Sequence, residues 1–143
     1  MKYLKYFSLG LALALTTGMS WGNQASSRVL EINSDTEYEK LMESKNPVLI
    51  KFAADWCGVC TNIKEQFAQV AAMDDFKNIT FACVNIDKAP EASKKNSIVG
   101  VPSFLYLENG QKKGESVGVR SLNAFNTTLA EEVRKTFNIA SAK

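Results

Sequence analysis

The sequence predicts an α/β fold in which helices cover both faces of one central, mixed β-sheet. Its apolar residues switch repeatedly between the periodicity of strands and that of helices, in the order β-α-β-α-β-α-β-β-α. Strands joined through helices are expected to pair in parallel, whereas Asn109-Gly110 is a strong signal for a tight hairpin between the last two strands. The 143 residues, 45% of them hydrophobic and 22% charged, suit one globular domain.

Three segments predict the first part of this fold. Residues 28–32 alternate weakly between apolar and polar and predict a short strand. An S-x-x-E capping box at residues 34–37 predicts the start of a short helix, whose apolar stripe comprises Tyr38, Leu41 and Met42. Residues 47–53 are almost continuously apolar, which indicates a strand buried on both faces.

A longer helix is expected over residues 57–73, with an apolar stripe that comprises Val59, Ile63, Phe67, Val70 and Ala71. This prediction puts Cys57 at the exposed N-terminus of the helix and Cys60 one turn deeper, where it is shielded. Residues 79–86 are rich in β-forming residues and predict the next strand.

The last part of the chain completes the sheet and adds two helices. A short helix is expected over residues 91–96, and the strands of the hairpin over residues 103–107 and 115–119. Ser121 is expected to cap a final helix that ends near Phe137. The apolar stripe of this helix comprises Leu122, Phe125, Leu129 and Val133.

The N-terminal segment has the order of a cleavable secretory signal. Two lysines precede a short apolar run at residues 7–15, and Ser20 and Gly22 supply small residues before a cleavage point. The run is too short to span a bilayer, and an uncleaved amphipathic anchor is the alternative. We therefore expect a signal peptide at residues 1–22, a single mature domain at residues 23–143, and a periplasmic or secreted location.

The charge of the mature domain is balanced. Cleavage would leave 15 of the 17 basic residues against 15 acidic ones. Nucleic-acid binding needs a basic excess concentrated on one face, and the pairs Lys94-Lys95 and Lys112-Lys113 are isolated. We expect neither nucleic-acid binding nor stable membrane insertion of the mature domain.

The sequence has no histidine and three cysteines, which restricts the chemistry. An imidazole base and a histidine-ligated metal are excluded. A zinc site needs about four ligands, which three cysteines without histidine do not supply. We expect no metal and no cofactor.

Cys57 and Cys60 form a C-x-x-C pair, Trp56-Cys57-Gly58-Val59-Cys60, at the predicted start of a helix. Unpaired backbone N–H groups at a helix start favour a thiolate, and the cysteine pKa falls from about 8.5 to between about 3.5 and 7.5 in such sites. Cys57 is therefore expected to be the nucleophile and Cys60 the resolving cysteine. A permanent disulfide is the structural alternative, but so small a loop removes little chain entropy.

Three stretches resemble the thioredoxin family, and together they extend over most of the mature chain. They are residues 52–60, residues 84–87 and the proline loop at residues 98–102. The resemblance implies the thioredoxin fold, a cis peptide bond before Pro102, and pairing of the Val101 backbone with an extended substrate segment. The substrate contacts that it implies are Trp56, Gly58, Val59, Val101, Pro102 and Gly118.

Four residues depart from the family pattern. Val59 replaces a proline between the cysteines, and such changes alter the relative stability of thiolate and disulfide. Lys51 and Cys83 replace a buried acid and a lysine near it, so the usual proton relay of the family is absent. Glu65 replaces the proline that kinks the active-site helix, so this helix is expected to be straighter.

Two of these departures have alternative interpretations. Either the stem of Lys51 packs while its amine reaches water, or a partly buried Lys51 lies below Cys60 and tunes its pKa. Cys83 is expected to be a buried small hydrophobe rather than a third redox centre, because it lies in an apolar strand.

We therefore expect an exported thiol-disulfide oxidoreductase that exchanges disulfides with protein substrates through Cys57 and Cys60. Its partners would be protein thiols and disulfides, together with a membrane-bound or exported redox partner. A reductase or isomerase is favoured, because no inserted helical domain, as in strong periplasmic oxidants, fits between Asp87 and Val101. The alternatives are a disulfide-forming oxidant, a redox-inert thioredoxin-like binding or chaperone module, and a metal carrier.

Overall fold

One mixed sheet of five strands forms the centre of the structure. The computed structural model describes residues 28–140, and the predicted signal peptide at residues 1–22 lies outside the described residues. The strand order is β1-β3-β2-β4-β5. The strands are β1 (Val29–Ile32), β2 (Val48–Ala53), β3 (Thr80–Asn85), β4 (Ser103–Glu108) and β5 (Gln111–Val117). β3 pairs in parallel with β1 and β2, whereas β4 pairs antiparallel with β2 and β5, which confirms the expected mixed sheet.

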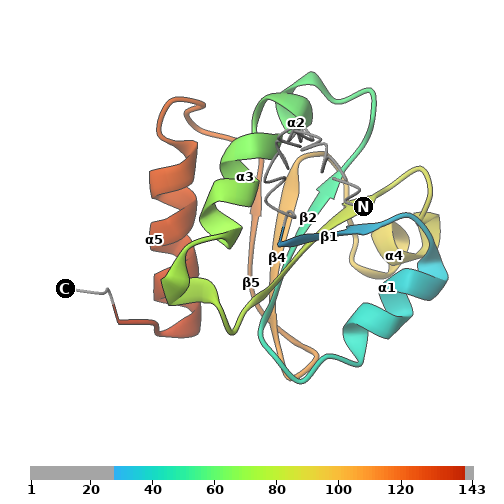
Figure 1. Ribbon diagram of the computed structural model, residues 1–143. Coiled ribbons are helices and arrows are strands. Elements are labelled where there is room, and N and C mark those ends of the chain that lie inside the picture. The colour runs from blue at the N-terminus through green and yellow to red at the C-terminus, as the bar shows by residue number, and fades with distance from the viewer. Residues whose placement is uncertain (1–27, 141–143) are drawn as a thin grey trace, which may run out of the picture.

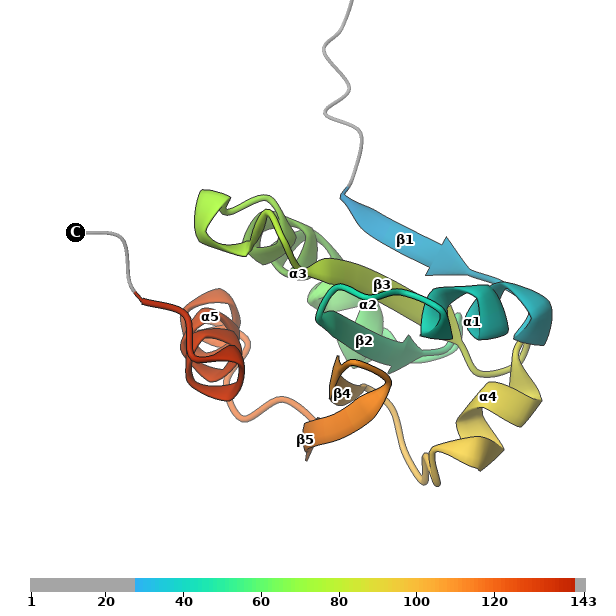
Figure 2. The same ribbon diagram turned by 90° about the horizontal axis from the view of Figure 1, so that it is seen from below.

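Helices cover both faces of this sheet (Figures 1 and 2). One face carries α3 (Lys64–Ala71) and α5 (Phe125–Phe137), and the other carries α1 (Asp35–Met42) and α4 (Pro90–Lys95). The short helix α2 (Gly58–Asn62) follows β2 and lies at one end of the sheet (Figure 1). No helix within residues 28–140 is long and apolar enough to cross a membrane.

β2 is buried along its whole length and separates two hydrophobic cores. Leu49 belongs to the core beneath α3 and α5, whereas Ile50 and Phe52 belong to the core beneath α1 and α4. The first core is rich in aromatic rings: the Phe81 ring centroid lies 5.6 Å from that of Phe67 and 6.1 Å from that of Phe76. The apolar run predicted at residues 47–53 is therefore confirmed as a strand buried on both faces.

Two local sequence signals have the expected structures. Ser34 caps α1, and its Oγ accepts a hydrogen bond of 3.2 Å from the Glu37 N–H. Asn109 (φ 51°) and Gly110 (φ 72°) both have left-handed backbones, as a two-residue hairpin turn requires. Because the turn is this tight, β5 begins at Gln111, earlier than the expected strand at residues 115–119.

The single straight helix expected over residues 57–73 is wrong. The chain forms two helices that meet at Ile63, which is both the C-cap of α2 and the N-cap of α3. Ile63 is fully buried, and its backbone (φ −94°, ψ −1°) departs from helical values. The interruption occurs without a proline, and Ile63 and Phe67 still enter the same core.

The expected start of the last helix is also wrong. α5 begins at Phe125 after Ala124, without a side-chain cap, so Ser121 does not cap it. Leu122 is 40% exposed, because it precedes the helix and lies outside the stripe that Phe125, Leu129 and Val133 bury.

Phe81→Ala should lower the free energy of unfolding by about 3 to 5 kcal/mol, because it opens a cavity between two other aromatic rings. Urea unfolding followed by circular dichroism measures this loss. Leu122→Ala is the control, since truncating this exposed side chain should change stability by no more than about 0.5 kcal/mol. Equal effects of the two variants would contradict the assignment of the core.

Candidate redox site

Cys57 and Cys60 are joined by a disulfide at the start of α2. Cys57 is the N-cap residue of this helix, and its Sγ accepts a hydrogen bond of 3.2 Å from the Cys60 N–H. The same donor would stabilise a Cys57 thiolate once the disulfide is reduced, because a hydrogen bond to the charged form lowers a thiol pKa. The predicted positions of the two cysteines, one at the helix start and one inside the helix, are confirmed.

The expected exposure of Cys57 is wrong for this disulfide form. Cys57 is 7% exposed and Cys60 is 4% exposed, so both are buried. They belong to one small apolar cluster with Ala53 and Ala54, and Val101 packs against it. Position at the helix start, rather than exposure, therefore distinguishes the two cysteines.

Exposed apolar side chains adjoin the two cysteines in the chain. Trp56, which precedes Cys57, is 69% exposed, and its Nε1 donates a 2.9 Å hydrogen bond to Asp87. Val59, between the cysteines, is also exposed. An indole anchored at one edge and open on its faces can contact an apolar partner without reorganising.

The predicted proline loop packs beside the cysteines. The Val101-Pro102 peptide bond is cis, as the resemblance implies. The Pro102 carbonyl oxygen accepts a 2.8 Å hydrogen bond from the Gly118 N–H, which ties the end of β5 to this loop. Gly118 has φ 77°, and a Cβ there would meet no other heavy atom within 4 Å. The glycine is therefore required by its left-handed backbone rather than by a close contact.

Two exposed valines at this loop escaped the sequence analysis. Val99 lies in the loop, three residues before Pro102, and Val117 pairs with Ser103 directly after the loop. Both side chains are open to solvent, Val99 at 93% and Val117 at 65%. Only the position of Val99 in the proline loop could have indicated its role, since no periodicity marks either valine.

Lys51 lies on β2 beneath the disulfide end of the sheet. It is 2% exposed, so the interpretation in which its amine reaches water is wrong. The alternation of side chains along β2 directs Lys51 to the same face as Leu49, where its Nζ lies 4.9 Å from the centroid of the Phe67 ring. α3 covers this face of the sheet.

Cys83 is the neighbour of Lys51 on β3. It is partly buried rather than fully enclosed, and it packs against both the aromatic core and the cluster that holds the disulfide. Burial raises the pKa of the Cys83 thiol, and the nearby Lys51 ammonium partly opposes this effect. The expectation of a small apolar side chain thus holds only in part, because Cys83 also contacts a buried charge.

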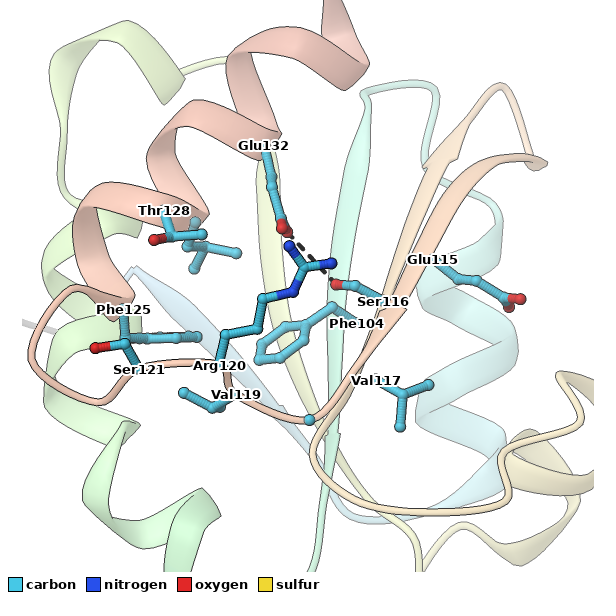
Figure 3. Close-up of a pocket in the computed structure, with 12 residues that line it drawn as sticks. Phe104, Glu115, Ser116, Val117, Val119, Arg120, Ser121, Phe125, Thr128 and Glu132 are labelled. Carbon is cyan, nitrogen blue, oxygen red and sulfur yellow. Dashed lines mark hydrogen bonds between the residues drawn. The ribbon is translucent and has the colours of Figure 1, made fainter.

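Two cavities flank the site. One, of about 390 Å³, is lined by Cys60, Lys51 and Cys83 among others. A second, of about 230 Å³, lies between β5 and α5 and contains neither cysteine (Figure 3). In this second cavity the Glu132 carboxylate accepts hydrogen bonds from Ser116 Oγ and from the Tyr106 hydroxyl. Burial and the nearby Glu132 carboxylate both raise the pKa of Tyr106. The first cavity therefore adjoins the disulfide, and the second does not.

Comparison with known proteins gives a consistent result. The family model described as Thioredoxin matches residues 29–131. A thioredoxin of Neurospora crassa is 29% identical over 119 residues, which cover 82% of this chain and 94% of the relative. A thioredoxin H-type of Oryza sativa subsp. indica is 32% identical over 108 residues, covering 76% and 86%. The crystal structure of Schistosoma mansoni thioredoxin superposes with a TM-score of 0.64 at 29% identity and covers 76% of this chain and 95% of that one.

With Cys57 and Cys60 joined, Cys83 is the remaining thiol, so its alkylation by iodoacetamide can be followed alone. Its raised pKa predicts slower alkylation at about pH 8 in the folded protein than in the unfolded chain. Lys51→Met should raise this pKa further, because it removes the ammonium that opposes burial, whereas Lys64→Met should have a smaller effect. Mass spectrometry across a pH series measures the midpoints.

The same shift fixes the sign of a pH effect on stability. Folding favours the neutral Cys83 thiol. Its contribution to the free energy of unfolding is therefore fully present below the ordinary thiol pKa and is lost as the pH rises through the raised pKa of Cys83 in the folded protein. A midpoint in the folded protein at or below that of the unfolded chain would contradict this description of the site.

Proposed function

The chain belongs to the thioredoxin family of thiol-disulfide oxidoreductases, and on that premise we propose that it is exported and acts on protein disulfides as a reductase or isomerase. The observation that carries the assignment of roles is the capping geometry of Cys57. Its sulfur lies at the start of α2 and accepts the Cys60 N–H, which makes it the better-stabilised thiolate.

The proposed reaction proceeds through a mixed disulfide. The Cys57 thiolate attacks one sulfur of a substrate disulfide, forms a new S–S bond and releases the other substrate sulfur as a thiolate. The Cys60 thiol, after losing its proton, then attacks Cys57 Sγ, which releases the second substrate thiolate. Two electrons pass to the substrate, the enzyme becomes the Cys57–Cys60 disulfide, and a redox partner must return two electrons.

The exposed apolar residues around the disulfide support protein substrates. Trp56, Val59, Val99 and Val117 offer contact area that a small disulfide reagent does not need. Val101 packs against the cysteine cluster, so a substrate segment that paired with its backbone would lie beside Cys57. Pro102, Gly58 and Gly118 complete the proposed substrate contacts.

The direction of electron flow has two candidates. Only α4, a helix of six residues, separates β3 from β4, which supports the reductase or isomerase over oxidants that carry an inserted helical domain. The buried Lys51 favours the oxidant, because a cation that lines the same cavity as Cys60 stabilises the thiolate of the reduced form.

Export is proposed from the signal-like residues 1–22. In an exported setting the disulfide would be reduced by a membrane-bound or exported partner, since no cytosolic thiol pool is present there. In an exported setting, the direction of electron flow depends on the reduction potential of the Cys57–Cys60 couple relative to the redox potential of the compartment.

The equilibrium potential of the couple in a glutathione buffer separates the two directions. A value near about −270 mV is expected for the reductase, whereas a value near about −120 mV would establish the oxidant instead. Acid quenching followed by alkylation traps the thiol and disulfide forms. Their ratio gives the equilibrium constant with glutathione, from which the potential follows.

Substitution of each cysteine tests the assigned roles. Cys57→Ser should abolish disulfide exchange, because the attacking sulfur is lost. Cys60→Ser should retain attack but accumulate mixed disulfides with protein substrates, which non-reducing electrophoresis detects. The reverse pattern would show that Cys60 is the nucleophile.

A further inference from the structure

The cavity of about 390 Å³ lies on the Cys60 side of the disulfide. Cys60 and Cys83 line it together with the apolar Ala53 and Ala54 and the buried Lys51. This combination joins a redox sulfur, a free thiol and a cation around one space. Neither the exchange reaction nor substrate docking, as described above, uses the cavity.

The charges around the cavity are not balanced. It is lined by three lysines and two carboxylates, and the two exposed lysines each have an acid: Lys64 Nζ is 3.6 Å from Glu31, and Lys88 Nζ is 3.8 Å from Asp55. Within residues 28–140, none of the ion pairs includes Lys51. Of the three lysines that line the cavity, the one without a carboxylate is thus the buried one.

A buried ammonium without an anion is unfavourable, because its lost hydration must be replaced. The Phe67 ring and the neutral Cys83 thiol replace part of it. On the Phe67 side Lys51 borders a cavity of only about 20 Å³, room for about one water molecule. An external counter-ion can therefore approach Lys51 only from the larger cavity beside Cys60.

We propose that this cavity binds a small, weakly hydrated inorganic anion, held by Lys51 between Cys60 and Cys83. Thr61, Asn33 and Asn85 supply polar groups to the lining, whereas Ala53, Ala54 and the two cysteines cannot replace lost hydration, so an ion that gives up its water easily is favoured. Entry is open, because Lys64 and Asp55 at the rim are both exposed to solvent.

The anion site regulates the redox couple, an inference that rests on the proposed function. In the disulfide form the sulfur atoms carry no charge and do not compete for Lys51. After reduction, at a pH that ionises Cys60 as well as Cys57, a thiolate at Cys60 borders the same cavity and competes with the anion. The anion therefore binds the disulfide form more tightly and, by linkage, opposes reduction.

The binding test uses the disulfide form and sodium thiocyanate as the probe, with ionic strength held constant by the bulky sulfonate buffer MES. Amide signals of Lys51, Thr61 and Cys83 in ¹H–¹⁵N spectra should shift and saturate. Lys51→Met should remove the saturable shift, whereas Lys64→Met, the matched lysine on the rim, should retain it. Linear shifts, or saturation that persists in Lys51→Met, would overturn the site.

A comparison within the wild-type protein does not depend on whether Lys51→Met folds. The same titration after reduction with excess dithiothreitol, at a pH where Cys60 is ionised, should give much weaker binding than in the disulfide form. Equal affinity in both forms would overturn the competition between anion and thiolate.

The linked redox measurement is the equilibrium of the protein with glutathione at constant ionic strength and at a fixed pH where Cys60 is ionised. In this reaction two glutathione thiols reduce the disulfide and form oxidised glutathione. The apparent constant for reduction should fall about tenfold at an anion concentration nine times its Kd. Lys64→Met should show the same tenfold fall as the wild type. In Lys51→Met the apparent constant should not change with the anion concentration. Saturable binding without disulfide exchange would refute the proposed function alone, and exchange without saturable binding would refute the anion site alone.

Discussion

The complete burial of β2 is the constraint on which the other features depend. This strand pairs in parallel with β3 and antiparallel with β4, and it carries side chains into both cores. Its last residue, Ala53, leads directly into the turn that positions Cys57. The same pairing brings Cys83 on one neighbour, and the loop before Ser103 on the other, to the disulfide end of the sheet.

That constraint also decides the environment of Lys51. A side chain at the fourth position of β2 must point into one core or the other, and alternation directs it beneath α3. An apolar residue there would pack without electrostatic consequence. A lysine instead introduces a buried positive charge that borders the same cavity as Cys60, and in the proposed function this charge would favour the form of the site that holds a negative sulfur.

The exposed side and the buried side of the disulfide therefore have different roles in the proposed enzyme. On the outer side, Trp56 and the exposed valines form an apolar surface suited to a protein substrate. On the inner side, the buried Lys51 and the partly buried Cys83 form a charged and polarisable environment. Recognition and redox tuning are thus separated in space, so a substitution on one side need not alter the other.

The sequence by itself determined the strand and helix order, the hairpin at Asn109-Gly110 and the placement of Cys57 and Cys60 around a helix start. These features depend on local periodicity and on backbone preferences of a few neighbouring residues, which the sequence displays directly. Only the tertiary structure decided the break at Ile63, the late start of α5 and the burial of Lys51 and Cys57. Each of these depends on which distant segments pack against the residue, because burial is a property of the assembled layers rather than of any local pattern.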